Sequence, residues 1–317
     1  MIQSTAMRRL LLVAWLLAVA VAGPRGKASL ASARTPVTGV WGFVSETNTE
    51  TGALIRDDRT WSGIWAFTGH YHVLARMEQH RKSRTNDELA KLPADEQAKY
   101  YEQLLHVSST AGTYTVDGQT LRRRWLISLT PAIIGQESVG TFSLDGDRLS
   151  VDLPRRSADS GPATRVVYRR LEDSAAGRPT PVTGVWGFVS ETDDETGKIL
   201  NDQNTLEAIW AFTNKYYVVA RMQKGRTSLP GAELEKLPPA EQVKYYEQLR
   251  RYTSTAGEYS VDGQALRRKW QISNGPDLIG QESVGKYAVD GDRLLVELPR
   301  RSAANGPGVR LVYKRLE

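Results

Sequence analysis

The chain has 317 residues, of which 40% are hydrophobic and 25% charged, and it contains no cysteine. The missing cysteine excludes a disulfide framework, a thiolate metal site and a cysteine nucleophile. The formal net charge is +6, but the first 33 residues hold four basic side chains and no acidic ones, so +2 remains on the rest of the chain. That balance argues against the broad basic field of nucleic-acid-binding domains, and we expect no nucleic-acid partner.

The first 33 residues are typical of a secretory signal peptide. Arg8 and Arg9 form a short basic head, and an apolar run follows over residues 10–22. Small-x-small cleavage motifs end at Ala22 and Ala33. A membrane span needs about 20 apolar residues, which favours cleavage over a retained anchor. We therefore expect an exported protein, periplasmic or secreted, with no membrane span in its mature form.

After this segment the same sequence occurs twice. Residues 36–172 align without a gap on residues 181–317, and 85 of the 137 positions are identical. This unit is longer than the roughly 20–50 residues of solenoid and propeller repeats, and long enough for a core of its own. We predict two tandem domains, each able to fold alone, joined by a short polar linker over residues 173–180.

Each copy is predicted to form eight short strands, because apolar residues alternate along them. In the first copy these strands span residues 37–47, 60–68, 71–77, 110–116, 120–129, 137–144, 148–153 and 164–171. Residues 48–58 are polar and predict a loop, while Pro93 opens a single helix between the third and fourth strands. Closure into a barrel removes the sheet edges. The expected fold class is all-β: two tandem eight-stranded antiparallel barrels, each with one inserted helix.

Several motifs then follow in a fixed order. A Gly-x-Trp ends at Trp41 on the first strand, Arg170 lies near the end of the last strand, and Gly-rich turn motifs occur at residues 112–118, 135–137 and 144–149. Together they resemble the bacterial lipocalin-like domain family, a calycin-type barrel, over nearly all of both copies. The resemblance implies a small barrel that holds one small ligand. The inserted helix and the absent disulfides depart from lipocalins proper, so the ligand class is not carried over.

The resemblance also implies a closed barrel floor. In it, Arg170 lies over the Trp41 indole, and Arg315 lies over Trp186 in the second copy. Such a cation–π contact is worth about 0.5–2 kcal/mol. We expect these four residues to be structural.

The fifth strand carries the strongest candidates for ligand contact. Arg123 shares the apolar face of that strand with Trp125, and an unpaired buried charge is costly. Glu137 on the next strand is the expected partner. Three interpretations stay open: an internal Arg–Glu pair, a pair that orients a ligand, and an arginine at a solvated mouth. The candidate ligand-binding residues are Trp65, Tyr71, Arg123, Trp125 and Glu137, with Trp210, Tyr216, Arg268, Trp270 and Glu282 in the second copy.

For the other polar residues we expect no role in ligand binding. Arg76 and its counterpart Arg221 are expected on a solvated face. All four histidines lie in the first copy and have non-histidine counterparts in the second, so a function shared by both copies cannot need them. His70 and His72 share a strand face, but we expect no metal site, no cofactor and no catalytic residues.

These observations favour an exported protein that binds a small, mostly apolar molecule in each barrel. One alternative is a barrel enzyme of the isomerase or cyclase type that uses the Arg–Glu pair for acid–base chemistry. Another is a structural or surface module with a solid core. A cavity of about 300 Å³ or more would favour ligand binding over a filled barrel. Protein partners stay open.

Overall fold

The computed structural model describes residues 35–155, 161–172, 178–299 and 308–317. The predicted signal peptide over residues 1–33 and part of the predicted linker lie outside these ranges. Within them, no helix has the length and apolar character needed to cross a membrane.

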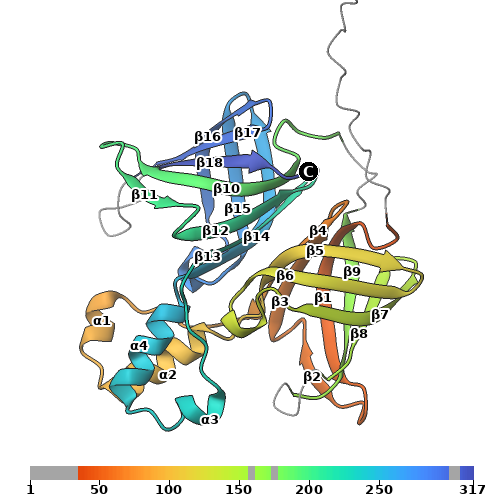
Figure 1. Cartoon of the computed structure of the whole chain (residues 1–317), viewed down its shortest axis with the longest axis vertical. Helices are drawn as coiled ribbons and strands as arrows, with labels where there is room; N and C mark the ends of the chain where they lie inside the picture. The colour runs from red at the N-terminus through yellow and green to blue at the C-terminus, as the bar shows by residue number, and fades with distance from the viewer. Residues whose placement is uncertain (1–34, 156–160, 173–177, 300–307) are drawn as a thin grey trace, which may run out of the picture. The chain divides into compact units, whose positions relative to one another are not determined.

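Each repeat forms one antiparallel sheet of nine strands whose first and last long strands pair, so that the sheet closes on itself. In the first repeat the strands are β1 (Gly39–Asn48), β2 (Leu54–Asp57), β3 (Trp61–Phe67), β4 (Tyr71–Glu78), β5 (Thr110–Asp117), β6 (Thr120–Ser128), β7 (Glu137–Asp145), β8 (Arg148–Leu153) and β9 (Thr164–Glu172). In the second they are β10 (Gly184–Asp193), β11 (Ile199–Asp202), β12 (Leu206–Phe212), β13 (Tyr216–Gln223), β14 (Tyr252–Asp262), β15 (Ala265–Ser273), β16 (Glu282–Asp290), β17 (Arg293–Leu298) and β18 (Val309–Arg315). The β1–β9 and β10–β18 pairings close barrel 1 and barrel 2, which confirms the predicted fold class (Figure 1).

The ninth strand of each sheet lies in a segment that was predicted to be a loop. β2 pairs with the second half of β1, where Ser45 lies opposite Asp57 and Glu46 opposite Arg56. β3 pairs only with the first half of β1, from Gly39 to Gly42. β2 is therefore an extra strand outside the closed ring of eight.

The predicted single helix is a pair of helices in each repeat. Between β4 and β5 lie α1 (Asn86–Ala90) and α2 (Ala94–Leu104), and between β13 and β14 lie α3 (Gly231–Leu234) and α4 (Pro239–Leu249). Thr85 begins α1 with a capping box to Glu88, and Pro93 is the N-cap of α2. Apolar side chains of α2 and α4 share one cluster with Leu89, so the helices of the two repeats pack together.

Side chains alternate between the inside and the outside of each barrel. On β4, Leu74 belongs to the interior core with Trp65 and Tyr168, while Val73 and Ala75 belong to a different cluster on the outside. The interior is rich in aromatic rings, and Trp65, Phe67 and Tyr168 are almost fully buried.

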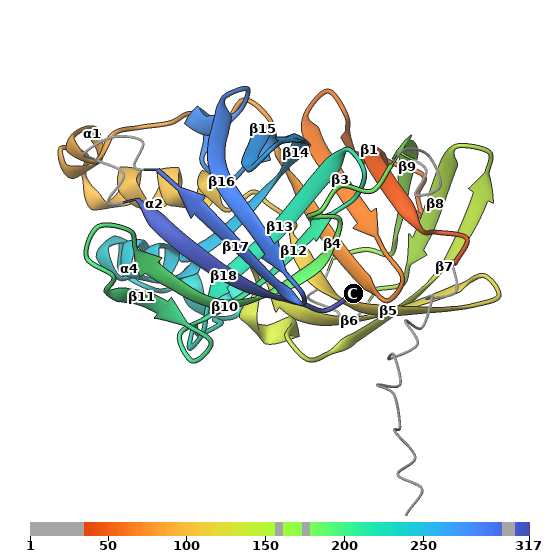
Figure 2. The same ribbon diagram turned by 90° about the horizontal axis from the view of Figure 1, so that it is seen from above.

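The outer cluster joins the two repeats. Ala66, Val73, Ala75 and Met77 from barrel 1 pack in one apolar core with their counterparts Ala211, Val218, Ala220 and Met222 from barrel 2. Figure 2 gives the second view of β3, β4, β12 and β13, which carry these residues. The outer faces of these strands are therefore apolar and packed together rather than solvated.

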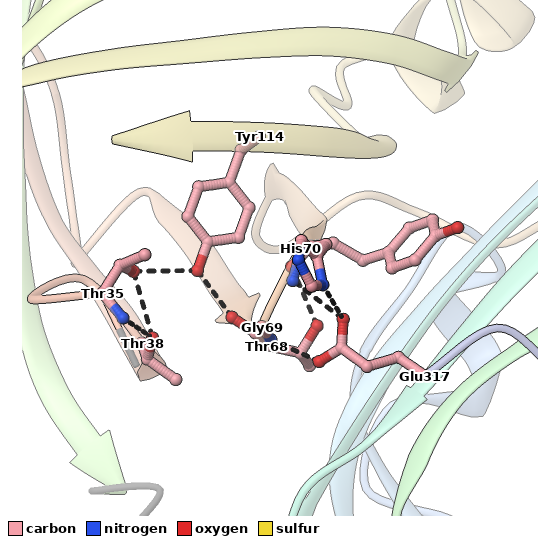
Figure 3. Close-up of polar contacts among 8 residues, drawn as sticks. Thr35, Thr38, Thr68, Gly69, His70, Tyr114 and Glu317 are labelled. Carbon is pink, nitrogen blue, oxygen red and sulfur yellow. Dashed lines mark hydrogen bonds and ion pairs between the residues drawn. The ribbon is translucent and has the colours of Figure 1, made fainter. Parts of the chain in front are cut away.

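Polar contacts between the repeats come in equivalent pairs. The Arg81 guanidinium donates to the carbonyl oxygen of Ser273 at 2.7 Å, and Arg226 donates to that of Ser128 at 2.6 Å. The Glu317 carboxylate accepts the backbone N–H groups of Gly69 and His70 in the β3–β4 turn (Figure 3).

The Glu172 carboxylate does the same in the β12–β13 turn, where it accepts the backbone N–H groups of Asn214 at 2.9 Å and Lys215 at 3.0 Å. The last residue of each repeat, Glu172 or Glu317, therefore binds a turn of the other repeat.

Candidate functional site

One end of each barrel is closed as the family resemblance implied. The Arg170 guanidinium lies 4.1 Å from the centre of the Trp41 ring, and Arg315 lies 4.0 Å from that of Trp186. The Trp41 indole N–H also donates to the carbonyl oxygen of Val37 at 2.8 Å. The predicted stack is present in both barrels.

A second set of contacts ties the chain across the same end of barrel 1. The Tyr114 hydroxyl donates to the carbonyl oxygen of Thr68 and hydrogen-bonds to Thr35 Oγ1 at 2.9 Å (Figure 3). Thr35 and Thr38 bond to each other just before β1 begins. These contacts hold the segment before β1 against the closed end.

The opposite half of barrel 1 contains a cavity of about 310 Å³. Its apolar wall includes Trp65, Leu74, Trp125, Val151, Val166 and Tyr168, and its polar lining includes Glu46, Arg56, Ser108, Thr110, Arg76, Arg123 and Arg155. The volume is at the lower end of the roughly 300–1,000 Å³ typical of ligand pockets. Three of the residues singled out from the sequence, Trp65, Arg123 and Trp125, meet on this cavity.

A buried ion network forms part of the polar lining. The Glu46 carboxylate oxygen Oε2 lies 3.1 Å from Arg56 Nη1 and 3.0 Å from Arg76 Nη1. Burial lowers the pKa of Arg56, and the charge of Glu46 opposes that shift. Arg76 was predicted on a solvated face, but it is only 6% exposed. That prediction is wrong because the other face of β4 packs on barrel 2, which leaves the arginine inside.

Arg123 lies within the barrel, as its place on the apolar face of β6 predicted. Its guanidinium carbon is 5.1 Å from the Trp65 ring centre and 5.7 Å from that of Trp125, and Nη2 donates to Ser138 Oγ at 3.0 Å. Glu137 is exposed, and its backbone lies opposite Arg124. The predicted Arg123–Glu137 pair is therefore wrong by one residue, because Ser138 is the β7 side chain that faces inward.

The second barrel repeats this arrangement. Arg268 Nη2 donates to Ser283 Oγ at 3.0 Å, and its guanidinium carbon lies 5.0 Å from the Trp210 ring centre and 5.7 Å from that of Trp270. Glu282 is exposed on the outside of β16, so the predicted Arg268–Glu282 pair is wrong for the same reason.

Tyr71 and Tyr216 are not interior residues. Both pack against the apolar cluster between the repeats, on the outer faces of β4 and β13. The interior position next to Tyr71 belongs to His72, which is fully buried and accepts a hydrogen bond from the Trp65 indole N–H at 3.4 Å. Predicting an interior tyrosine here failed because both faces of β4 are buried, so burial alone does not reveal the direction of a side chain.

His72 and His70 do not share an environment. Burial and the neighbouring Arg123 charge lower the pKa of His72 well below its ordinary value. His70 is largely exposed beside Glu317, in the turn that joins β3 to β4. Among the described residues, no group of three or more acidic or histidine side chains is placed to hold a metal ion.

Two polar atoms on the cavity lining have no hydrogen-bond partner within the described part of the chain. They are Arg76 Nε and Thr110 Oγ1, and both are buried. Thr110 on β5 lies opposite Leu74 on β4, so Thr110 is a diagonal neighbour of Arg76 on the same barrel face. A buried donor without a partner is costly, so this corner of the cavity is suited to an acceptor from a ligand.

Comparisons with known proteins identify no family for the chain: no family model matches it, and no curated protein matches it. Among solved structures, an uncharacterized protein from Saccharomyces cerevisiae aligns with 88% of this chain and 97% of its own, at 10% identity and a TM-score of 0.42. A protein of unknown function of the DUF3598 family from Nostoc punctiforme aligns with 88% of this chain and 96% of its own, at 10% identity and a TM-score of 0.21.

A mutant of the vaccine antigen transferrin-binding protein B from Haemophilus parasuis aligns with 82% of this chain and 61% of its own. Its identity is 8% and its TM-score 0.18. With TM-scores below 0.5, these likenesses carry no argument about function.

Proposed function

We propose that this chain is an exported, tandem lipocalin-like binding protein, and that each barrel takes a small molecule with an apolar body and an anionic group. The observation that carries the proposal is a pair of buried polar atoms, Arg76 Nε and Thr110 Oγ1, which have no hydrogen-bond partner among the described residues and lie on a cavity of about 310 Å³. Export rests on the first 33 residues of the sequence.

The charge of the cavity supports an anionic group. Among the described residues that line it, the buried guanidinium group of Arg76 and the partly buried one of Arg56 share one carboxylate, that of Glu46. Burying cations without equal negative charge is costly. A carboxylate or phosphate group on the ligand would balance the charge and accept charge-assisted hydrogen bonds.

The remaining wall supports an apolar or aromatic body. Trp65 and Trp125 flank Arg123, and Tyr168 and Leu74 complete the surface beside them. A ring placed here would pack on indole faces. The cavity volume favours a ligand over a solid core. Glu137 points outward, so the Arg123–Glu137 pair considered for acid–base chemistry is absent from the described lining of the cavity.

The test begins with native mass spectrometry of the protein purified from its own host, to find a co-purifying small anion. We expect Arg123→Ala to weaken binding of that molecule at least tenfold, which is the effect of about one charge-assisted contact. Arg122→Ala is the matched control, because Arg122 is exposed on the other face of β6. Affinity is measured well below the melting temperature. Equal affinity of Arg123→Ala and the parent would refute the assigned role.

A further inference from the structure

We propose, on the basis of the function proposed above, that the two barrels prefer ligands of different charge. Barrel 1 takes a doubly charged group such as a phosphate monoester, and Arg56 sets this preference. In barrel 2 the position of Arg56 is occupied by Asn201, and a singly charged group is preferred.

The site in barrel 1 has a guanidinium that Glu46 only partly engages. Arg56 and Arg76 each place one Nη1 on the same carboxylate oxygen, Oε2. Arg76 Nε stays without a partner among the described residues. The Glu46 carboxylate is thus in contact with two guanidinium groups, while the charge of Glu78 also acts on Arg56, and N–H groups remain for an incoming anion.

A neighbouring ring holds Arg56 over the cavity. Its guanidinium carbon lies 4.3 Å from the centre of the Trp61 ring, and its side chain is 33% exposed. Arg56 is therefore a cation fixed at the border between cavity and solvent. That position suits a residue that contacts the charged end of a ligand whose apolar end lies against Trp65.

The same site in barrel 2 is balanced. Arg221 contacts both carboxylate oxygens of Glu191, so its two terminal nitrogens are engaged. Asn201 Nδ2 donates to Glu191 Oε2 without adding charge. Leu206 stands where barrel 1 has Trp61, so the cation and its ring platform have changed together.

Charge alone can then distinguish two ligands of the same shape. A phosphate monoester carries a charge near −2 at neutral pH, whereas a sulfate monoester carries −1 with similar tetrahedral oxygens. An additional guanidinium close to the group favours the dianion strongly where water is partly excluded. The expected difference in affinity between the two esters therefore comes from their charge and needs no difference in shape.

The experiment is isothermal titration calorimetry of the full chain with phenyl phosphate and with phenyl sulfate at pH 7.5. We expect one site that prefers phenyl phosphate at least tenfold, with a preference that falls as salt is added. In Arg56→Asn this preference is lost, and in the double variant Asn201→Arg/Leu206→Trp a second phosphate-preferring site is gained. Arg59→Asn is the matched control, because Arg59 pairs with Asp57 on the exposed surface and its loss removes the same charge.

A second arm separates the sources of such a group. Co-sedimentation with phosphatidic acid vesicles tests a lipid headgroup, and the small cavity leads us to expect binding of the soluble ester only. Equal affinity for both probes in the parent, or a preference that survives Arg56→Asn, would overturn the inference while leaving anion binding intact. Failure of the parent to bind either probe would overturn both this inference and the proposed function. The fold of each variant is checked by near-ultraviolet circular dichroism. Barrel 2 already has asparagine, Asn201, at the position of Arg56, so we expect Arg56→Asn to fold.

Discussion

The arginines of barrel 1 have different neighbours at the two ends of the barrel. Arg170 lies over the Trp41 ring at the closed end and donates to the carbonyl oxygen of Thr38. Arg76 and Arg123 lie in the cavity half, against a carboxylate and a hydroxyl respectively. Arginine thus stacks on a tryptophan at one end of the barrel and lines the cavity at the other.

We expect Arg170→Ala to lower the free energy of unfolding by about 1–2 kcal/mol, because it removes a desolvated cation–π contact. Ligand affinity should not change, since Arg170 is remote from the cavity lining. Urea unfolding followed by fluorescence measures the first effect and calorimetry the second. Arg169→Ala is the control, because Arg169 is exposed on the same strand. A weaker ligand affinity in Arg170→Ala would contradict the assignment of this residue to the floor.

His72 should make the stability of the protein depend on pH. Burial and Arg123 lower its pKa in the folded state below the ordinary value of 6.5. The unfolded chain therefore binds more protons than the folded one below pH 6.5, and stability is lost as the pH falls through that value. The slope contributed by one proton approaches about 1.4 kcal/mol per pH unit.

The check is the free energy of unfolding measured between pH 7.5 and pH 5. His72→Asn should be less steep than the parent over this range, because its side chain does not titrate. His80→Asn is the matched substitution outside the core, because His80 is exposed at a φ of +58°, which asparagine tolerates. If His72→Asn is as steep as the parent, His72 is not the group that titrates.

At the scale of elements, strand positions were readable because apolar alternation and Asp-Gly turns mark them. β2 was missed because Leu54 and Ile55 are both exposed and because its pairing with β1 contains a register shift. The direction of Arg76 and Tyr71 was missed because β4 is buried on both faces, and only the interface explains its outer face. On β7 the alternation of side chains decides which residue meets Arg123: Glu137 points outward, and the next residue, Ser138, points inward.

The bulge in β5 gives a prediction at this scale. The register shifts between Ala111 and Gly112, and a Cβ on Gly112 would lie 1.8 Å from the carbonyl oxygen of Arg124. Backbone would have to move, so Gly112→Ala should destabilise barrel 1 by on the order of 3 kcal/mol. Gly231→Ala, at the start of α3 with open space around it, should be close to neutral. Thermal unfolding compares the two, and a small effect at Gly112 would mean that the bulge can relax.

At the scale of the whole described chain, the repeats share an apolar core that neither could cover alone. The residues in it occur as equivalent pairs, such as Ala75 with Ala220 and Met77 with Met222. The sequence predicted two barrels from the repeat, but not this interface, because an apolar outer face and an apolar core strand have the same pattern. Identity between the repeats at these positions follows from a surface that packs against its own counterpart.

Separating the repeats should therefore produce a dimer rather than a soluble monomer. Residues 35–172 contain all the strands that close barrel 1, so we expect this piece to fold. Its outer face, with Val73, Ala75 and Met77, would then be exposed, and a self-complementary apolar face favours a two-fold dimer. Analytical ultracentrifugation should show twice the monomer mass.

A charge at the centre of that face tests the mechanism of association. Ala75→Glu should convert the dimer of residues 35–172 to a monomer, because burying an unpaired carboxylate costs more than the interface gains. Thr141→Glu is the matched control, since Thr141 is exposed on β7 away from the cluster, and it should leave the dimer intact. In the full chain Ala75→Glu should lower the unfolding midpoint, because the linked repeats cannot separate to relieve the charge. A piece that is monomeric without the substitution, and that binds no apolar dye, would show that the outer face of β4 does not need a partner.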